Sequence, residues 1–186
     1  MRVDPFLISI DQLVYRTIPD APNNNPLDPL YAALTDRNRR GEPTLYLGGD
    51  PRVMATEWAR HVEDEIKDPA IAGEQRYRRT FDVRASLDRV LDVRDPALCR
   101  TLSLQNAPWC FADSKRLCQQ TSSRLRQQTD ARAIIVPAIG LIDQPDRWVL
   151  VVFTDKLPTY PEPFLTDLKA DGTLPAWLAW NRTENR

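Results

Sequence analysis

LYLGGDPRVMATEWARH (residues 45–61) predicts a strand that turns sharply into a helix. Its first residues are apolar or aromatic, as at a strand end, and Gly48-Gly49 can turn the chain because glycine tolerates positive φ. Asp50 is a suitable N-cap, and Pro51 then occupies the first helical position, where its missing N–H costs nothing. Glu57 lies at the edge of the apolar face, so the helix directs a carboxylate toward its own core. That face consists of Val53, Met54, Trp58 and Val62.

Strands and helices follow one another along the chain without strict alternation. Strands are expected at residues 6–18, 44–47, 77–83, 90–93, 133–137 and 148–153. Helices are expected at 51–67 and 112–128, with helical turns at 30–34 and 96–104. This order favours an α+β fold over a doubly wound parallel sheet. With 186 residues and no internal repeat, the chain is expected to form a single domain, residues 1–186.

Composition limits the classes of function. The formal net charge of −1 gives no general attraction to nucleic acid or anionic membrane, so direct binding to either is not expected. The longest apolar run, residues 133–142, is about half of a membrane span, and no secretion signal is visible. Cys99, Cys110 and Cys118 form no CxxC pair, and we interpret them as reduced thiols of a cytoplasmic protein.

Whole classes of chemistry are excluded by missing motifs. His61 is the single histidine and no zinc-type cysteine spacing occurs, so no metal site is expected. A Ser-His-acid triad would need His61, which follows Glu57 by one helical turn in a pairing typical of helix-surface electrostatics. Neither GxxxxGK[ST] nor GxGxxG occurs, which argues against a phosphate-binding loop.

Several short motifs, taken in order, resemble the RES domain, a family named for its Arg, Glu and Ser. The resemblance covers roughly residues 10–157, and the order and spacing of the motifs carry it. Residues 158–186 form a tail rich in Pro and Trp, which we expect to pack on the domain because two exposed tryptophans would form an apolar patch. The motifs are Val14-Tyr15-Arg16, Gly41-Glu42-Pro43-Thr44-Leu45-Tyr46-Leu47, Ala55-Thr56-Glu57, Val90-Leu91-Asp92-Val93-Arg94-Asp95-Pro96, the predicted helix from Ser114 to Leu125, and Ala133-Ile134-Ile135-Val136-Pro137.

The resemblance implies a fold, an activity and a partner. RES domains are toxins of bacterial toxin–antitoxin pairs, with an Xre-type antitoxin as partner, and their fold resembles that of ADP-ribosyltransferase toxins, with mixed sheets and flanking helices. Their members consume NAD+. The resemblance therefore implies a toxin that cleaves the nicotinamide–ribose bond of NAD+, with water or phosphate as acceptor. A homo-oligomer or a hetero-oligomer with the antitoxin is compatible with this.

The resemblance also assigns site residues. Arg16 takes the place of the family arginine, Glu57 that of the glutamate, and Tyr46 that of a tyrosine that precedes the glutamate. An arginine presents a planar fork of donors suited to pyrophosphate or ribose oxygens, and a tyrosine can stack on a ring while its hydroxyl binds a ribose. Cleavage of the glycosidic bond develops oxocarbenium character, which a nearby carboxylate such as Glu57 stabilises.

Further substrate-binding candidates are Tyr31, at the pocket mouth, and Arg37, in the loop before Gly41, although this loop is offset from the family pattern. The family serine after Val136-Pro137 is replaced by Ala138. If that hydroxyl binds substrate, its loss costs about 1.5–3 kcal/mol.

Three alternatives remain open. Arg16 and Glu57 can instead form a buried structural salt bridge, with Tyr46 in the core. The enzyme can transfer ADP-ribose to a protein target rather than to water or phosphate. The chain can also be a catalytically impaired RES-like binding module, since it carries Ala138.

Overall fold

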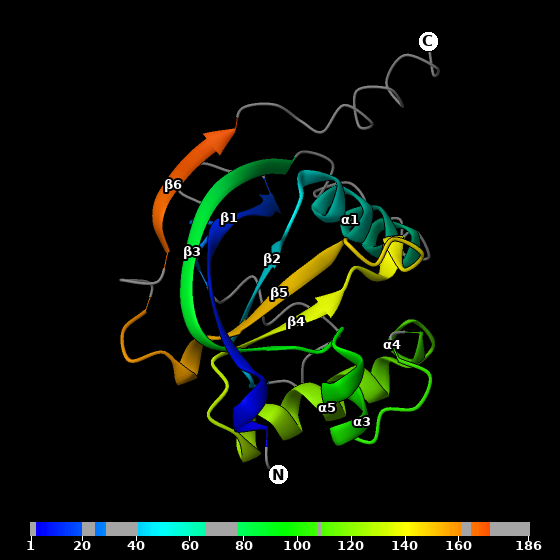
Figure 1. The fold of residues 1–186 in the computed structure, drawn as a ribbon. Helices are drawn as coiled ribbons and strands as arrows, with labels where there is room; N and C mark the ends of the chain where they lie inside the picture. The colour runs from blue at the N-terminus through cyan, green and yellow to red at the C-terminus, as the bar shows by residue number, and fades with distance from the viewer. Residues whose placement is uncertain are drawn as a thin grey trace.

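The strands close into a barrel. The structure is a computed structural model that describes residues 3–19, 25–28, 41–65, 78–107, 109–160 and 165–171. Its sheet has the order β1-β2-β5-β4-β3-β6, and β1 also pairs with β3, so five strands form a closed ring and β6 lies against β3 (Figure 1). The predicted mixture of strands and helices is confirmed. The strands are β1 (Leu7–Pro19), β2 (Thr44–Gly48), β3 (Arg78–Asp92), β4 (Ala133–Pro137), β5 (Trp148–Phe153) and β6 (Leu165–Asp171).

The long strand β3 closes the barrel by pairing with β1 on one side and β4 on the other. It pairs antiparallel with β1 along its length and parallel with β4 near its end, where Val90 is opposite Ala133. The prediction of two strands, 77–83 and 90–93, is wrong, because a single strand, β3, runs through both segments and the residues between them. In this stretch Ala85 and Leu87 are buried and alternate with exposed polar residues, which is the pattern of a half-buried strand.

The helices lie in two places. α1 (Pro51–Glu65) lies near the ends of β2 and β4 (Figure 1). The other helices lie together as a second group, away from α1: α3 (Pro96–Thr101), α4 (Cys110–Asp113) and α5 (Lys115–Gln128). The helix predicted at 112–128 is divided at Ser114, whose extended backbone ends α4 and whose hydroxyl caps α5 by accepting from Leu117 N at 3.1 Å. Within the described residues, no helix has the length and apolarity needed to cross a membrane. The described residues also include three short 3₁₀ helices: η1 (Asp4–Phe6), η3 (Ile139–Leu141) and η4 (Thr154–Lys156).

Two apolar clusters lie on opposite faces of the sheet. Because side chains alternate along a strand, each of the five barrel strands contributes to both clusters. The first cluster, here called the barrel core, draws on all five barrel strands and includes Val14, Ile18, Leu45, Leu47, Val83, Ile135 and Leu150. The second, here called the helix-side core, joins the sheet to the helices and includes Val53, Leu98, Phe111, Leu125, Ala138, Val149 and Phe153.

The corner between β2 and α1 forms as the opening segment predicts, with one correction. Asp50 caps α1, since its Oδ1 accepts from Arg52 N at 2.7 Å. Neither Gly48 nor Gly49 adopts positive φ, so that part of the prediction is wrong. Glycine is needed here for close approach: a Cβ on Gly49 would lie 2.3 Å from Cε2 of Trp148, and one on Gly48 would lie 2.8 Å from Cγ of Met54.

Candidate functional site

Glu57 lies where α1 meets η3. Its Oε1 accepts a hydrogen bond from Gly140 N at 2.9 Å, and its Oε2 lies 3.3 Å from Nη1 of Arg60. The Glu57 side chain is 24% exposed, so the carboxylate lies at the edge of the packed interface. The helix thus directs this carboxylate toward two donors, one of them a peptide N–H from a neighbouring element.

Ala138 lies on the same side of the sheet, just before η3. Its side chain is 1% exposed and belongs to the helix-side core. Ala138 is also the N-cap residue of η3, with extended backbone and no side-chain hydrogen bond at the cap. The structure therefore brings Glu57 close to the segment that begins at Ala138, and Gly140 is the residue that joins them.

Arg16 lies on the other face of the sheet. It shares a face of β1 with Val14 and Ile18, two barrel-core residues, and is 4% exposed. Its Nη1 donates to the carbonyl oxygen of Tyr46 at 2.7 Å. β1 and β2 pair at Tyr15 and Gly48, so this bond adds a side-chain link between the same two strands.

The Tyr46 side chain points away from Arg16. It packs on the helix-side core, whereas its neighbours Leu45 and Leu47 face the barrel core. Arg16 and Tyr46 are therefore joined through the backbone of β2, while their side chains diverge. The alternative of an Arg16–Glu57 salt bridge is not supported, since the ion pair of Glu57 is with Arg60. Tyr31 and Arg37 lie outside the described residues.

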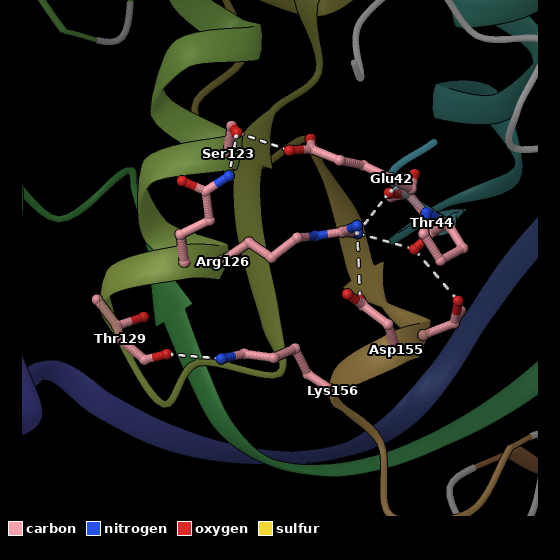
Figure 2. A network of polar contacts seen from close by, with 10 residues as sticks. Glu42, Thr44, Ser123, Arg126, Thr129, Asp155 and Lys156 are labelled. Carbon is pink, nitrogen blue, oxygen red and sulfur yellow. Dashed lines mark hydrogen bonds and ion pairs between the residues drawn. The ribbon is translucent and has the colours of Figure 1, made fainter. Parts of the chain in front are cut away.

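A second charged cluster, which the sequence did not predict, joins α5 to the start of β2 (Figure 2). Arg126 is 5% exposed, and its Nη2 donates to Pro43 O and to Thr44 Oγ1, both at 2.8 Å. Its Nη1 lies 3.5 Å from Oδ1 of Asp155. One turn earlier, Ser123 Oγ donates to Glu42 Oε1 at 2.6 Å. We refer to Glu42, Thr44, Ser123, Arg126 and Asp155 as the α5 cluster.

Burial dominates the electrostatics of the α5 cluster. Burial lowers the pKa of Arg126, and the nearby Asp155, Glu42 and Tyr46 act in the opposite direction. The guanidinium also stacks over Phe153, at 4.7 Å from the ring centroid. One sequence signal pointed to this cluster: α5 has few apolar residues, so polar side chains must cover part of its buried face. The buried residues of α5 are Thr121, Ser122, Ser123, Leu125 and Arg126.

The junction of α1 and η3 presents one carboxylate, that of Glu57, to its partly exposed edge. Among the described residues, no three His, Cys, Asp or Glu side chains gather as metal ligands would. A carboxylate fixed by Gly140 N–H and Arg60 can instead stabilise positive charge that develops nearby. The junction of α1 and η3 is therefore the candidate active site.

Comparison with known families agrees with the motifs. The sequence model of the RES domain matches residues 31–176. The chain belongs to the RES domain family. Glu57, Tyr46 and Ala138 of this RES domain lie within the matched range, as do Tyr31 and Arg37, whereas Arg16 lies before it. Comparison with curated proteins finds no match.

The RES domain has a structural relative in a toxin–antitoxin complex. A chain in the crystal structure of the M. tuberculosis MbcT–MbcA toxin–antitoxin complex is similar to it, with a TM-score of 0.66 at 18% sequence identity. The similarity covers 98% of this RES domain and 95% of that chain. At this level of identity, the comparison establishes the shared fold.

Proposed function

We propose that this RES domain is the toxin of a bacterial toxin–antitoxin pair, and that it binds NAD+ and cleaves the nicotinamide–ribose bond. Family membership and a fold shared with a chain of a toxin–antitoxin complex support the toxin assignment. The observation that carries the proposed chemistry is Glu57, held by Gly140 N–H and Arg60 at the partly exposed edge of α1.

The reaction needs a stabilised cation more than a strong base. When the bond between ribose C1′ and the nicotinamide nitrogen breaks, the electron pair leaves with nicotinamide and the ribose gains oxocarbenium character. The Glu57 carboxylate stabilises that charge, because two donors fix its orientation while further lone pairs stay available. The oxygen of water then bonds to C1′ and releases its proton to solvent, or an anionic oxygen of phosphate, which carries no proton, bonds to C1′.

Other residues complete the proposed site. The fold corresponds to that of the ADP-ribosyltransferase toxins, and Tyr46, Tyr31 and Arg37 contact the substrate. Arg16, buried on the opposite face of the sheet, supports substrate binding indirectly, because it fixes β2 through the Tyr46 carbonyl by a bond of 2.7 Å. An Xre-type antitoxin binds the domain and keeps it inactive.

Ala138 favours a second candidate, a RES-like binding module without catalysis. In the structure its methyl group is sealed in the helix-side core, so the third signature position offers no polar group to a ligand. Transfer of ADP-ribose to a protein target is a further alternative within the enzyme class.

One assay separates these candidates. The purified domain is incubated with NAD+, in the presence and absence of phosphate, and free nicotinamide is quantified. Release of nicotinamide with ADP-ribose indicates hydrolysis, whereas a phosphorylated ADP-ribose indicates phosphorolysis, and label transferred from NAD+ to protein indicates ADP-ribosylation. NAD+ binding without nicotinamide release would establish the binding module and contradict the proposed cleavage.

A further inference from the structure

Gly140 lies at a very close approach between η3 and α1. A Cβ at position 140 would lie 2.5 Å from Cγ2 of Thr56 and 3.1 Å from Cδ of Arg60. Carbon atoms in contact prefer separations of about 3.5–4.0 Å, so the present spacing requires a residue without a side chain. The reason for glycine here is space, since Gly140 does not adopt positive φ.

Thr56 gives the added carbon little room. Its Oγ1 donates to Arg52 O at 2.8 Å, which fixes the rotamer of a β-branched side chain. The methyl group therefore cannot turn away without losing this hydrogen bond. A side chain at position 140 would instead push η3 away from α1.

Such a shift would act on Glu57. The Gly140 N–H donates to Glu57 Oε1 at 2.9 Å, and the Arg60 stem that reaches Oε2 lies beside Gly140. We infer that Gly140 is a positioning residue. Because it has no side chain, η3 approaches α1 closely enough for the Gly140 N–H to orient the Glu57 carboxylate for cleavage of NAD+. This inference rests on the proposed function of Glu57.

Gly140→Ala tests the inference through turnover. We expect kcat for nicotinamide release to fall about tenfold to a hundredfold with little change in KM, because a displaced carboxylate acts on the transition state. Thr56→Ser removes the methyl group but keeps the hydroxyl that bonds to Arg52 O, so alone it should leave turnover near wild type. Combined with Gly140→Ala, it should restore most of the lost turnover.

The contact itself can be measured without turnover. In ¹⁵N-labelled protein, Glu57→Gln should move the amide proton signal of Gly140 upfield, because a hydrogen bond to a charged oxygen becomes a weaker one to a neutral oxygen. An unmoved signal would overturn the inference. So would wild-type turnover in Gly140→Ala, or a loss that Thr56→Ser does not recover. A wild-type protein that releases no nicotinamide would overturn the proposed function instead.

Discussion

Two charged clusters join a helix to a neighbouring element, and they differ in how far the arginine side chain is buried: that of Arg126 is 6% exposed and that of Arg60 is 31% exposed. In the α5 cluster, Arg126 is almost fully buried and binds the backbone and side chain at the start of β2. In the α1 cluster, defined here as Glu57, Arg60 and Gly140, the two charged side chains are partly exposed. Similar residue types can therefore stabilise the fold in one place and be available for chemistry in another, and we expect burial of the arginine to distinguish the two clusters.

Changes in the two clusters are expected to reduce different properties, stability in one and turnover in the other. Loss of a buried guanidinium removes its charged hydrogen bonds to the start of β2, so changes in the α5 cluster should reduce stability. A partly exposed carboxylate can be neutralised at little cost to folding, so changes at Glu57 should reduce turnover.

The largest effect on stability is expected for Arg126→Ala. Removal of the guanidinium removes its two hydrogen bonds, to Pro43 O and Thr44 Oγ1, and a charge beside the partly buried Glu42, and should lower the free energy of unfolding by about 3–5 kcal/mol, at about 1.5–3 kcal/mol for each charged hydrogen bond. Urea denaturation followed by fluorescence measures this. The matched control is Arg124→Ala on the exposed face of the same helix, where a change within about 0.5 kcal/mol is expected. An equal fall in the free energy of unfolding in the two variants would show that the α5 cluster contributes no more to stability than the exposed face of the helix.

A smaller effect is expected for Arg16→Lys. An ammonium group cannot reproduce the planar fork, so the link to the Tyr46 carbonyl weakens and the free energy of unfolding falls by about 1–2 kcal/mol. Calorimetry should also show weaker NAD+ binding. Arg84→Lys, on the exposed surface of β3, serves as control. Lost stability with unchanged NAD+ affinity would restrict Arg16 to a structural role.

Most of the fold could be predicted from the sequence, because it depends on local patterns. The strands at 133–137 and 148–153 and the Asp50 cap follow from apolar runs and capping chemistry, and their bounds are confirmed. The strand β6 was not predicted, because its segment, LTDLKAD, has weak strand character and is held by backbone pairing with β3.

The candidate site could be predicted only in part. Glu57 was predicted from its place on an amphipathic helix and from the resemblance. Gly140 and the α5 cluster were not, because their partners are far apart in sequence, as Ser123 and Glu42 are. The divergence of Arg16 and Tyr46 follows from strand alternation, but the sequence does not show which faces of β1 and β2 coincide.

The smallest effect is expected for Ala138→Ser. The position is sealed, so the hydroxyl should not reach substrate and should leave nicotinamide release almost unchanged. At the N-cap of η3 it can accept from a peptide N–H, which keeps the change in the free energy of unfolding within about 1 kcal/mol. Parallel assays of turnover and thermal unfolding measure both. A tenfold to hundredfold gain in turnover, the worth of about one charge-assisted hydrogen bond, would show instead that the position faces the substrate.

We propose that the partly exposed carboxylate of Glu57 carries the chemistry, and that the Glu42 carboxylate of the α5 cluster does not. The same substitution made in both clusters tests it most directly, with nicotinamide release and urea denaturation measured for Glu57→Gln and Glu42→Gln. We expect Glu57→Gln to lower turnover at least about a hundredfold with little loss of stability, because the oxocarbenium-like charge loses its counter-charge. Glu42→Gln should lower stability and leave turnover near wild type. Turnover near wild type in Glu57→Gln would show that Glu57 does not carry the chemistry.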